Sequence, residues 1–261
     1  MVEPQHFYEK IAHPTALKNS LEDIPRKAET RLQDIVAGPA LRGLRADYVV
    51  RIGKPSIEII LACSAWQAEL IIVGGPSQQE AHLLGSTADR VARKALVPVL
   101  VSNKPLEANA KRFLVPTDFS AGARKAAKEA LALARSFGAR IFFLHVLDQT
   151  PLFYAYGYEG DSFTSLPIPL LTPENMATEW KSFLSTLPLC SIGWEKRTVE
   201  GPGAKTILQH AEAIDADLIV MGAYGRNALE HVLLGGVTKA VVRAAACPVL
   251  TVRPEAFEFK L

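Results

Sequence analysis

Glycines with a spacing suited to anion binding follow one apolar segment of the chain. Gly222-Ala223-Tyr224-Gly225 is followed, after nine residues, by Gly235-Gly236-Val237-Thr238. The apolar residues 217–221 predict a buried strand before these glycines, and residues 237–245 predict a helix after them. Glycines at such a turn let backbone N–H groups approach an anion, which the helix N-terminus also favours. The pattern therefore indicates a phosphate site, although glycines that only form tight turns would give the same pattern.

The other reactive residue types form no recognised catalytic or metal-binding pattern. The six histidines lack His-x3-His spacing, and neither Gly-x-Ser-x-Gly nor His-Glu-x-x-His occurs. Gly201 to Thr206 resembles the end of a phosphate-binding loop, but Val199 and Ala204 stand where that motif has glycine. We interpret this segment as a strand-to-helix turn. Cys190 and Cys247 lie in apolar stretches and are expected in the core. No catalytic residue and no metal ligand is predicted.

The elements that must position these glycines occur in two copies. The same 21-residue spacing separates two pairs of glycines: Gly53 with Gly74, and Gly201 with Gly222. The offset of about 150 residues is too long for a solenoid repeat. It predicts two tandem domains, which we place at residues 1–104 and 109–254.

The second copy alternates strands and helices. Apolar runs predict strands at residues 112–117 and 140–147, and we predict further strands at 194–200, 217–221 and 249–252. Apolar residues at helical spacing predict four helices between them, at 127–137, 176–187, 207–214 and 237–245. Such alternation is typical of a parallel sheet covered on both faces, a doubly wound α/β domain. The long loop at 149–173 has no such period. Its aromatic residues either form a lid or partner surface or pack on their own domain.

The first copy is incomplete. It has nothing that corresponds to residues 111–145 of the second copy. What remains predicts helices at residues 17–35, 57–61 and 91–96, and strands at residues 48–52, 70–73 and 99–101.

The ordered motifs of the second copy resemble those of the universal stress protein family. Besides the glycines, they are Pro116-Thr117-Asp118 after the first strand, His145-Val146 at the second, and Cys247-Pro248-Val249-Leu250-Thr251-Val252 at the last. The resemblance implies two tandem doubly wound parallel-sheet domains of the adenine nucleotide alpha hydrolase-like type, the first incomplete. It also implies a stress-response protein whose C-terminal domain binds ATP or a related adenine nucleotide, with or without Mg²⁺, as a regulatory ligand.

The resemblance assigns twelve residues of the second copy to the nucleotide. Asp118 and Val146 would frame the adenosine, and the glycine loop would hold the phosphates. The full set is Pro116, Thr117, Asp118, Val146, Met221, Gly222, Tyr224, Gly225, Gly235, Gly236, Val237 and Thr238. Gly236 departs from the family's Ser or Thr and so lacks a hydroxyl donor worth about 0.5–1.5 kcal/mol, for which Thr238 is expected to substitute in part. In the first copy, Ser77 replaces the second glycine of the motif, so we expect no nucleotide site there.

Composition excludes other classes of protein. The 29 basic and 27 acidic residues leave a net charge of +2, which argues against nucleic-acid binding. No apolar run approaches the ~20 residues that span a bilayer, and the first residues lack a signal-peptide pattern. Three widely spaced cysteines argue against a disulfide framework. We therefore expect a cytoplasmic protein. Two rival functions stay open: a ligand-free interaction scaffold and a slow ATP-hydrolysing enzyme.

The strands at 99–101 and 249–252 are expected to pair, within the chain or in a homodimer, because apolar edge strands need covering. The family's strand order, 3-2-1-4-5, would leave the first copy's strand 48–52 two places away from strand 70–73. Either the sheet rearranges, or another chain supplies the missing strands, or the natural chain begins upstream. We expect the third, with roughly 40–50 further residues, the length of one β-α-β unit.

Overall fold

The computed structural model describes residues 14–75, 86–102, 104–148, 173–225 and 234–254. The chain separates into two compact units, Met1–Glu58 and Ile59–Leu261. This division does not follow the repeat, because the later elements of the first copy belong to the same unit as the second copy.

The first unit contains helix α2 (Pro14–Ala37), the short 3₁₀ helix η1 (Pro39–Leu41) and the first residues of α3 (Pro55–Ala65). The strand predicted at residues 48–52 is wrong: these residues form no strand, and Ile52 is 85% exposed. A strand needs a neighbour with which to pair its backbone groups. The elements that would neighbour this segment in a complete copy have no counterpart in the sequence, so its apolar residues alone do not produce a strand.

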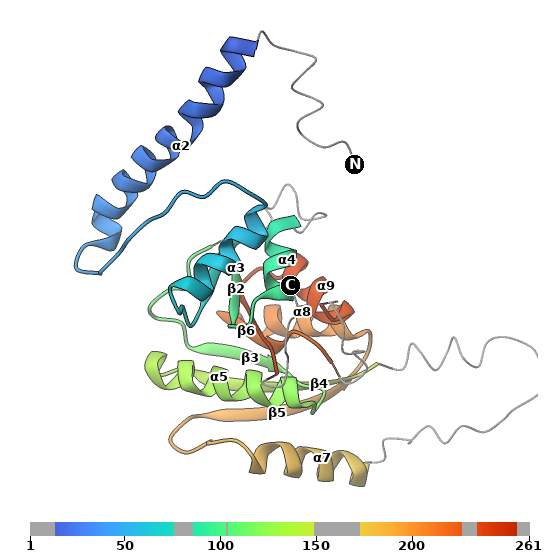
Figure 1. The fold of residues 1–261 in the computed structure, drawn as a ribbon. Helices are drawn as coiled ribbons and strands as arrows, with labels where there is room; N and C mark the ends of the chain where they lie inside the picture. Colours follow the sequence, from blue (N-terminus) through green and yellow to red (C-terminus); the bar gives the residue numbers. More distant parts are fainter. Residues whose placement is uncertain (1–13, 76–85, 103, 149–172, 226–233, 255–261) are drawn as a thin grey trace, which may run out of the picture. The chain divides into compact units, whose positions relative to one another are not determined.

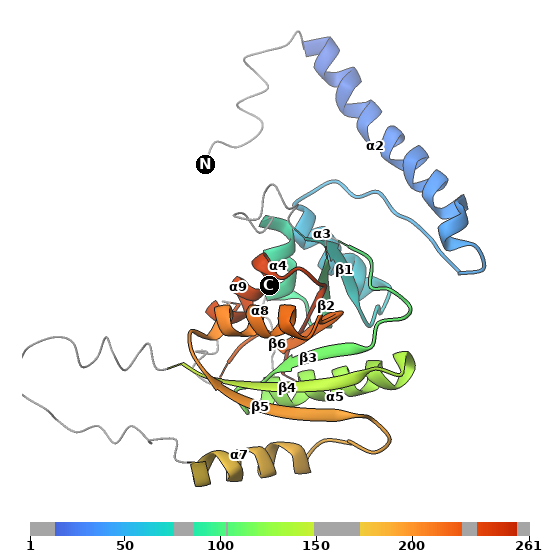
Figure 2. The same ribbon diagram turned by 180° about the vertical axis from the view of Figure 1, so that it is seen from behind.

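The second unit is built on one sheet (Figure 1). Its strands are β1 (Ile71–Gly74), β2 (Val99–Ser102), β3 (Arg112–Pro116), β4 (Arg140–Leu147), β5 (Trp194–Glu200), β6 (Leu218–Gly222) and β7 (Val249–Val252). Their order is β1-β2-β7-β6-β3-β4-β5, and Figure 2 shows β2, β6, β3, β4 and β5 following one another down the sheet. The part from β5 to β7 has the 3-2-1-4-5 order. The predicted doubly wound α/β fold is therefore confirmed for the second copy.

The two copies meet at the one antiparallel pair among the described strands, β2 with β7. Val99 lies opposite Thr251, and the Thr251 hydroxyl donates a hydrogen bond to the Val99 carbonyl at 3.2 Å. These are the two last strands that the sequence led us to expect at a seam. Through this pairing, β1 and β2 of the first copy extend the sheet of the second, and β1 forms its outer edge.

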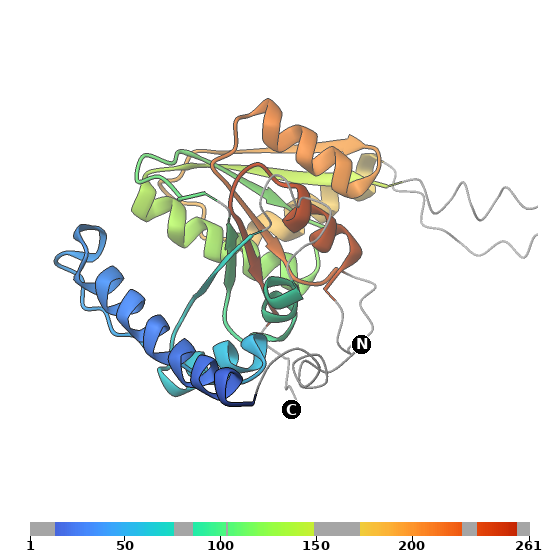
Figure 3. The same ribbon diagram turned by 90° about the horizontal axis from the view of Figure 1, so that it is seen from above.

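Helices cover both faces of this sheet. On one face, α5 (Ala121–Phe137) and α7 (Pro173–Ser185) contribute to one apolar core. On the other face, α4 (Ser86–Lys94), α8 (Gly203–Ala213) and α9 (Gly236–Ala244) contribute to a second. Figure 3 shows α5 and α8 on opposite sides of the strands. Gly138 ends α5 in the left-handed conformation that is common at helix C-termini.

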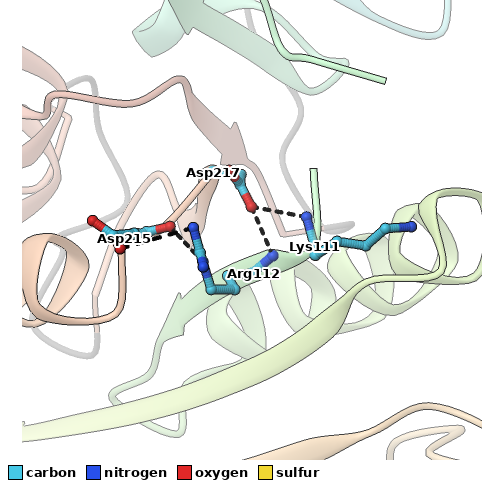
Figure 4. Close-up of polar contacts among 4 residues, drawn as sticks. All are labelled: Lys111, Arg112, Asp215 and Asp217. Atoms are coloured by element: carbon cyan, nitrogen blue, oxygen red, sulfur yellow. Dashed lines mark hydrogen bonds and ion pairs between the residues drawn. The ribbon is translucent and has the colours of Figure 1, made fainter. Parts of the chain in front are cut away.

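Polar contacts at the opposite end of the sheet from the glycines align β3 with β6 (Figure 4). One oxygen of the Asp217 carboxylate accepts hydrogen bonds from the backbone N–H groups of Lys111, at 2.8 Å, and Arg112, at 2.9 Å. The Arg112 Nε donates to the Asp215 carbonyl at 2.8 Å. These contacts set the register of β3 against β6, and therefore the positions of their carboxyl ends relative to one another.

The two cysteines expected in the core differ. Cys247 is buried, and burial raises the pKa of its thiol to about 11. Cys190 is exposed, so its predicted burial is wrong. It lies in the turn between α7 and β5, where apolar neighbours in sequence do not place a side chain in the core. None of the helices in the described part of the chain combines the length and hydropathy needed to cross a membrane.

Candidate functional site

A cavity of about 740 Å³ lies at the carboxyl ends of β3, β4 and β6. Chain connections leave β3 and β6 in opposite directions across the sheet, and open α/β sheets bind ligands at such a point. The volume is within the ~300–1,000 Å³ range of small-molecule sites. All the residues predicted from the sequence line this cavity: Pro116, Thr117, Asp118, Val146, Met221, Gly222, Tyr224, Gly225, Gly235, Gly236, Val237 and Thr238.

The turn after β3 holds the Asp118 carboxylate at the cavity. The Ser120 N–H donates to Asp118 Oδ1, and the Phe119 N–H donates to the Thr117 hydroxyl, each at 3.0 Å. Phe119 has a φ of 63°, a left-handed conformation that costs a residue with a side chain roughly 1–2 kcal/mol. Its ring is buried, with its centroid 4.4 Å from that of His145. Packing of this ring therefore stabilises the turn.

Close backbone packing requires glycine at position 222. A Cβ on Gly222 would lie 3.1 Å from the Gly122 carbonyl carbon and 3.3 Å from the Ala123 nitrogen, both in the first turn of α5. Neither backbone atom can move without displacing the helix. Gly222 therefore brings the loop and the start of α5 together beside the cavity.

The start of α9 is tied to the same loop. The Thr238 hydroxyl donates to the Gly222 carbonyl at 2.9 Å, and the Gly235 N–H donates to the Ala223 carbonyl, also at 2.9 Å. A hydroxyl has a single proton to donate. In this structure, Thr238 therefore stabilises the loop and does not supply the donor that we expected it to offer in place of a hydroxyl at Gly236.

Gly225 and Gly236 differ in the room beside their Cα atoms. A Cβ on Gly225 would lie 3.0 Å from Asp118 Oδ2, so the loop and this carboxylate face each other closely. A Cβ on Gly236 would have no described atom within 4 Å. The absent side chain at position 236 thus opens the cavity at the first residue of α9.

The two helices that begin at the cavity differ in whether a carboxylate lies at the N-terminus of the helix. The Gly203 N–H at the start of α8 donates to Asp148 Oδ2 at 3.1 Å, so a carboxylate already occupies that helix end. The N-cap of α9 is Gly235, which has no side chain to accept from the first N–H groups of the helix. The N-terminus of α9 is therefore the better place for an anion.

The sequence reasoning missed part of the lining. Asp148 directly follows β4, next to the predicted Val146, and its place after a strand end could have identified it. Gly203 is the first residue of α8, in the segment after β5 that the sequence reasoning interpreted as a strand-to-helix turn only. The other unpredicted lining residues are Ala123, Leu144, Ile207 and Leu234. They are apolar residues of neighbouring elements that no motif marks.

Two further predictions concern residues outside the described ranges. One is the long loop at 149–173, of which only Pro173 is described, and the other is the part of the first copy's glycine loop at residues 76–85. Within the described ranges, no group of three or more His, Cys, Asp or Glu side chains is placed to hold a metal ion. Among the described residues, the carboxylates of Asp118 and Asp148 line the cavity.

Comparison with known proteins gives one consistent result. The sequence model of the Universal stress protein family matches residues 6–103 and again residues 109–253. A universal stress protein of Methanocaldococcus jannaschii is 34% identical over 152 residues, 55% of this chain and 82% of the relative. One of Thermus aquaticus is 34% identical over 146 residues, 55% of this chain and 98% of the relative. The structure of a universal stress protein from Archaeoglobus fulgidus has the same fold, with a TM-score of 0.65 and 23% identity, covering 90% of this chain and 78% of its own.

Proposed function

The chain belongs to the universal stress protein family, and we propose that its second copy binds ATP, or a related adenine nucleotide, as a regulatory ligand in a stress response. The observation that carries this proposal is the cavity at the carboxyl ends of β3, β4 and β6, whose lining combines glycines and a helix start with apolar side chains. A nucleotide needs both kinds of lining, because it has an anionic end and a flat base.

The phosphates belong at the start of α9. Gly235 and Gly236 present backbone there without side chains, and the helix N-terminus favours negative charge. Carboxylates accept hydrogen bonds but repel phosphate. Asp118 and Asp148 therefore suit the hydroxyls of the sugar better than the phosphates, which places the ribose between the two ends of the cavity.

The base belongs among the apolar lining residues. Val146 and Ile207 come from β4 and α8. Val237, in the first turn of α9, is 42% exposed, and a ribose that covers it would remove apolar surface from water. Mg²⁺ would accompany the phosphates, which supply most of its ligands in such sites.

Titration calorimetry of the whole chain with ATP tests the proposal, with and without Mg²⁺. We expect one site per chain, because the glycine motif of the first copy is degraded. Two equivalent sites, or no heat at millimolar ATP, would contradict it. The same samples, analysed for ADP after incubation, separate the rival functions: intact ATP supports a regulatory ligand, steady turnover an enzyme, and the absence of binding a scaffold.

A further inference from the structure

The glycine loop of the second copy contacts a helix of the first copy. Tyr224 lies within the loop and lines the cavity, and its hydroxyl donates to the Arg93 carbonyl in α4 at 2.9 Å. Arg253, directly after β7, is only 4% exposed, and its Nη2 donates to the Tyr224 hydroxyl. Its guanidinium carbon lies 5.2 Å from the centroid of the Tyr224 ring. The guanidinium group of this buried arginine therefore contacts both the hydroxyl and the ring of Tyr224.

Arg253 also caps the end of α4. Its Nη1 donates to the Lys94 and Ala95 carbonyls, each at 3.2 Å. The last carbonyls of a helix have no partner within the helix, and a cation there interacts favourably with the helix dipole. The carbonyls of residues 93–95 are thus satisfied by Tyr224 and Arg253. The order of the α4 C-terminus and the position of the glycine loop depend on the same two side chains.

The residues that make this contact occur in the second copy and have no equivalents in the first. When Gly74 is aligned with Gly222, Pro76 corresponds to Tyr224; when Pro98 is aligned with Pro248, Asn103 corresponds to Arg253. Proline and asparagine carry neither a phenolic hydroxyl nor a guanidinium group. The first copy therefore lacks the residues with which to hold its own loop in the same way, although it supplies the helix that supports the other.

We propose that α4 of the first copy positions the nucleotide-binding loop of the second through Tyr224 and Arg253, so that ligand binding and the order of the α4 C-terminus are coupled. This inference rests on the proposed nucleotide site. The loop is also tied to α9, because the Thr238 hydroxyl donates to the Gly222 carbonyl and the Gly235 N–H donates to the Ala223 carbonyl, each at 2.9 Å, so a shift of Tyr224 would strain these contacts. A ligand that binds the held conformation stabilises α4, and α4 in turn favours the ligand, because linkage is reciprocal.

Arg253→Lys tests the coupling, because Arg253 does not line the cavity and touches the ligand only through Tyr224. Lysine keeps the charge but has no planar fork with which to reach the tyrosine and two carbonyls together. We expect ATP affinity to fall about three- to tenfold, since the competent loop becomes a smaller fraction of the population. Arg135→Lys is the matched control. Arg135 donates to the Pro188 carbonyl at 2.6 Å, near the end of α5 away from the cavity.

Hydrogen exchange of residues 86–95 gives a second measurement. We expect ATP to slow it in the wild type and in Arg135→Lys, but not in Arg253→Lys. Tyr224→Phe, which removes the hydroxyl and keeps the ring, gives the same comparison if Arg253→Lys does not fold. Unchanged exchange of residues 86–95 on ATP binding, or wild-type affinity in Arg253→Lys, overturns the proposal.

If the wild type binds no ATP, the proposed function fails, but the positioning is still tested. Arg253→Lys should then speed exchange at residues 223–225 relative to Arg135→Lys. Equal exchange in the two variants overturns the positioning role as well.

Discussion

Replacement of Gly236 by serine should strengthen ATP binding. A Cβ at this position meets no described atom within 4 Å, so the side chain fits without displacing its surroundings. Gly236 is the first residue of α9, and a hydroxyl there would reach toward the place proposed for the phosphates. A hydrogen bond to a charged group contributes about 1.5–3 kcal/mol, and a neutral one about 0.5–1.5. A gain of about 1–2 kcal/mol, roughly five- to thirtyfold in affinity, is therefore expected.

Gly236→Ala separates the hydroxyl from the other effects of the change. Either substitution removes backbone freedom from the unfolded chain, which stabilises a protein by about 0.4–1 kcal/mol where the conformation allows it. Both variants should therefore unfold at slightly higher temperature. Only the serine variant should bind ATP more tightly, as measured by calorimetry in the same buffer and Mg²⁺. Equal affinities in the two variants, or weaker binding with serine, would refute the placement of the phosphates at α9.

Three other changes have defined outcomes. Gly225→Val should abolish ATP binding by calorimetry, because a branched side chain would occupy the space that the phosphates need, and its Cβ would stand 3.0 Å from Asp118 Oδ2 at the cavity; unchanged affinity would show that the motif is only a turn. Thr238→Val should cost about 1–2 kcal/mol in urea unfolding, because it leaves the Gly222 carbonyl without its 2.9 Å donor; no loss would show that water replaces the bond. Burial raises the pKa of Cys247 from 9.0 to about 11, so the folded state holds that proton more tightly. The resulting stability is present below pH 9 and lost as pH rises toward 11. Urea unfolding should show the wild type losing up to about 2–3 kcal/mol more than Cys247→Ala over that window, and parallel pH profiles would refute this.

The sequence predicted those features that depend on residues near one another in the chain. The strands at Arg140–Leu147 and Trp194–Glu200 have the predicted bounds; the first is a continuous apolar run that follows the helix-ending Gly138, and the second ends just before the turn at Gly201. The glycines were identified by their spacing. All the predicted site residues line one cavity because the carboxyl ends of parallel strands meet at one edge of the sheet.

Features that depend on a distant neighbour were missed. Residues 48–52 are apolar enough for a strand, but the elements that would pair with them in a complete copy have no counterpart in the sequence, and local pattern carries no information on that. Ile207 and Leu234 reach the cavity only through the packing of α8 and the segment before α9. The contact of Arg253 with α4 joins residues about 160 positions apart, and no spacing rule connects them.

The antiparallel pairing of β2 with β7 also bears on how the chain folds as it is made. Val99 and Thr251 are 152 residues apart, so at about 5–20 residues per second β2 leaves the ribosome about 8–30 s before its partner strand exists. During that interval, β2 presents an unpaired apolar edge, the kind of surface that recruits strands from other chains. The half-sheet of β1 and β2 can complete its hydrogen bonding only after the second copy has folded. The second copy is thus the template on which the first is finished, and β7, the last of the described strands along the chain, joins the two parts of the sheet.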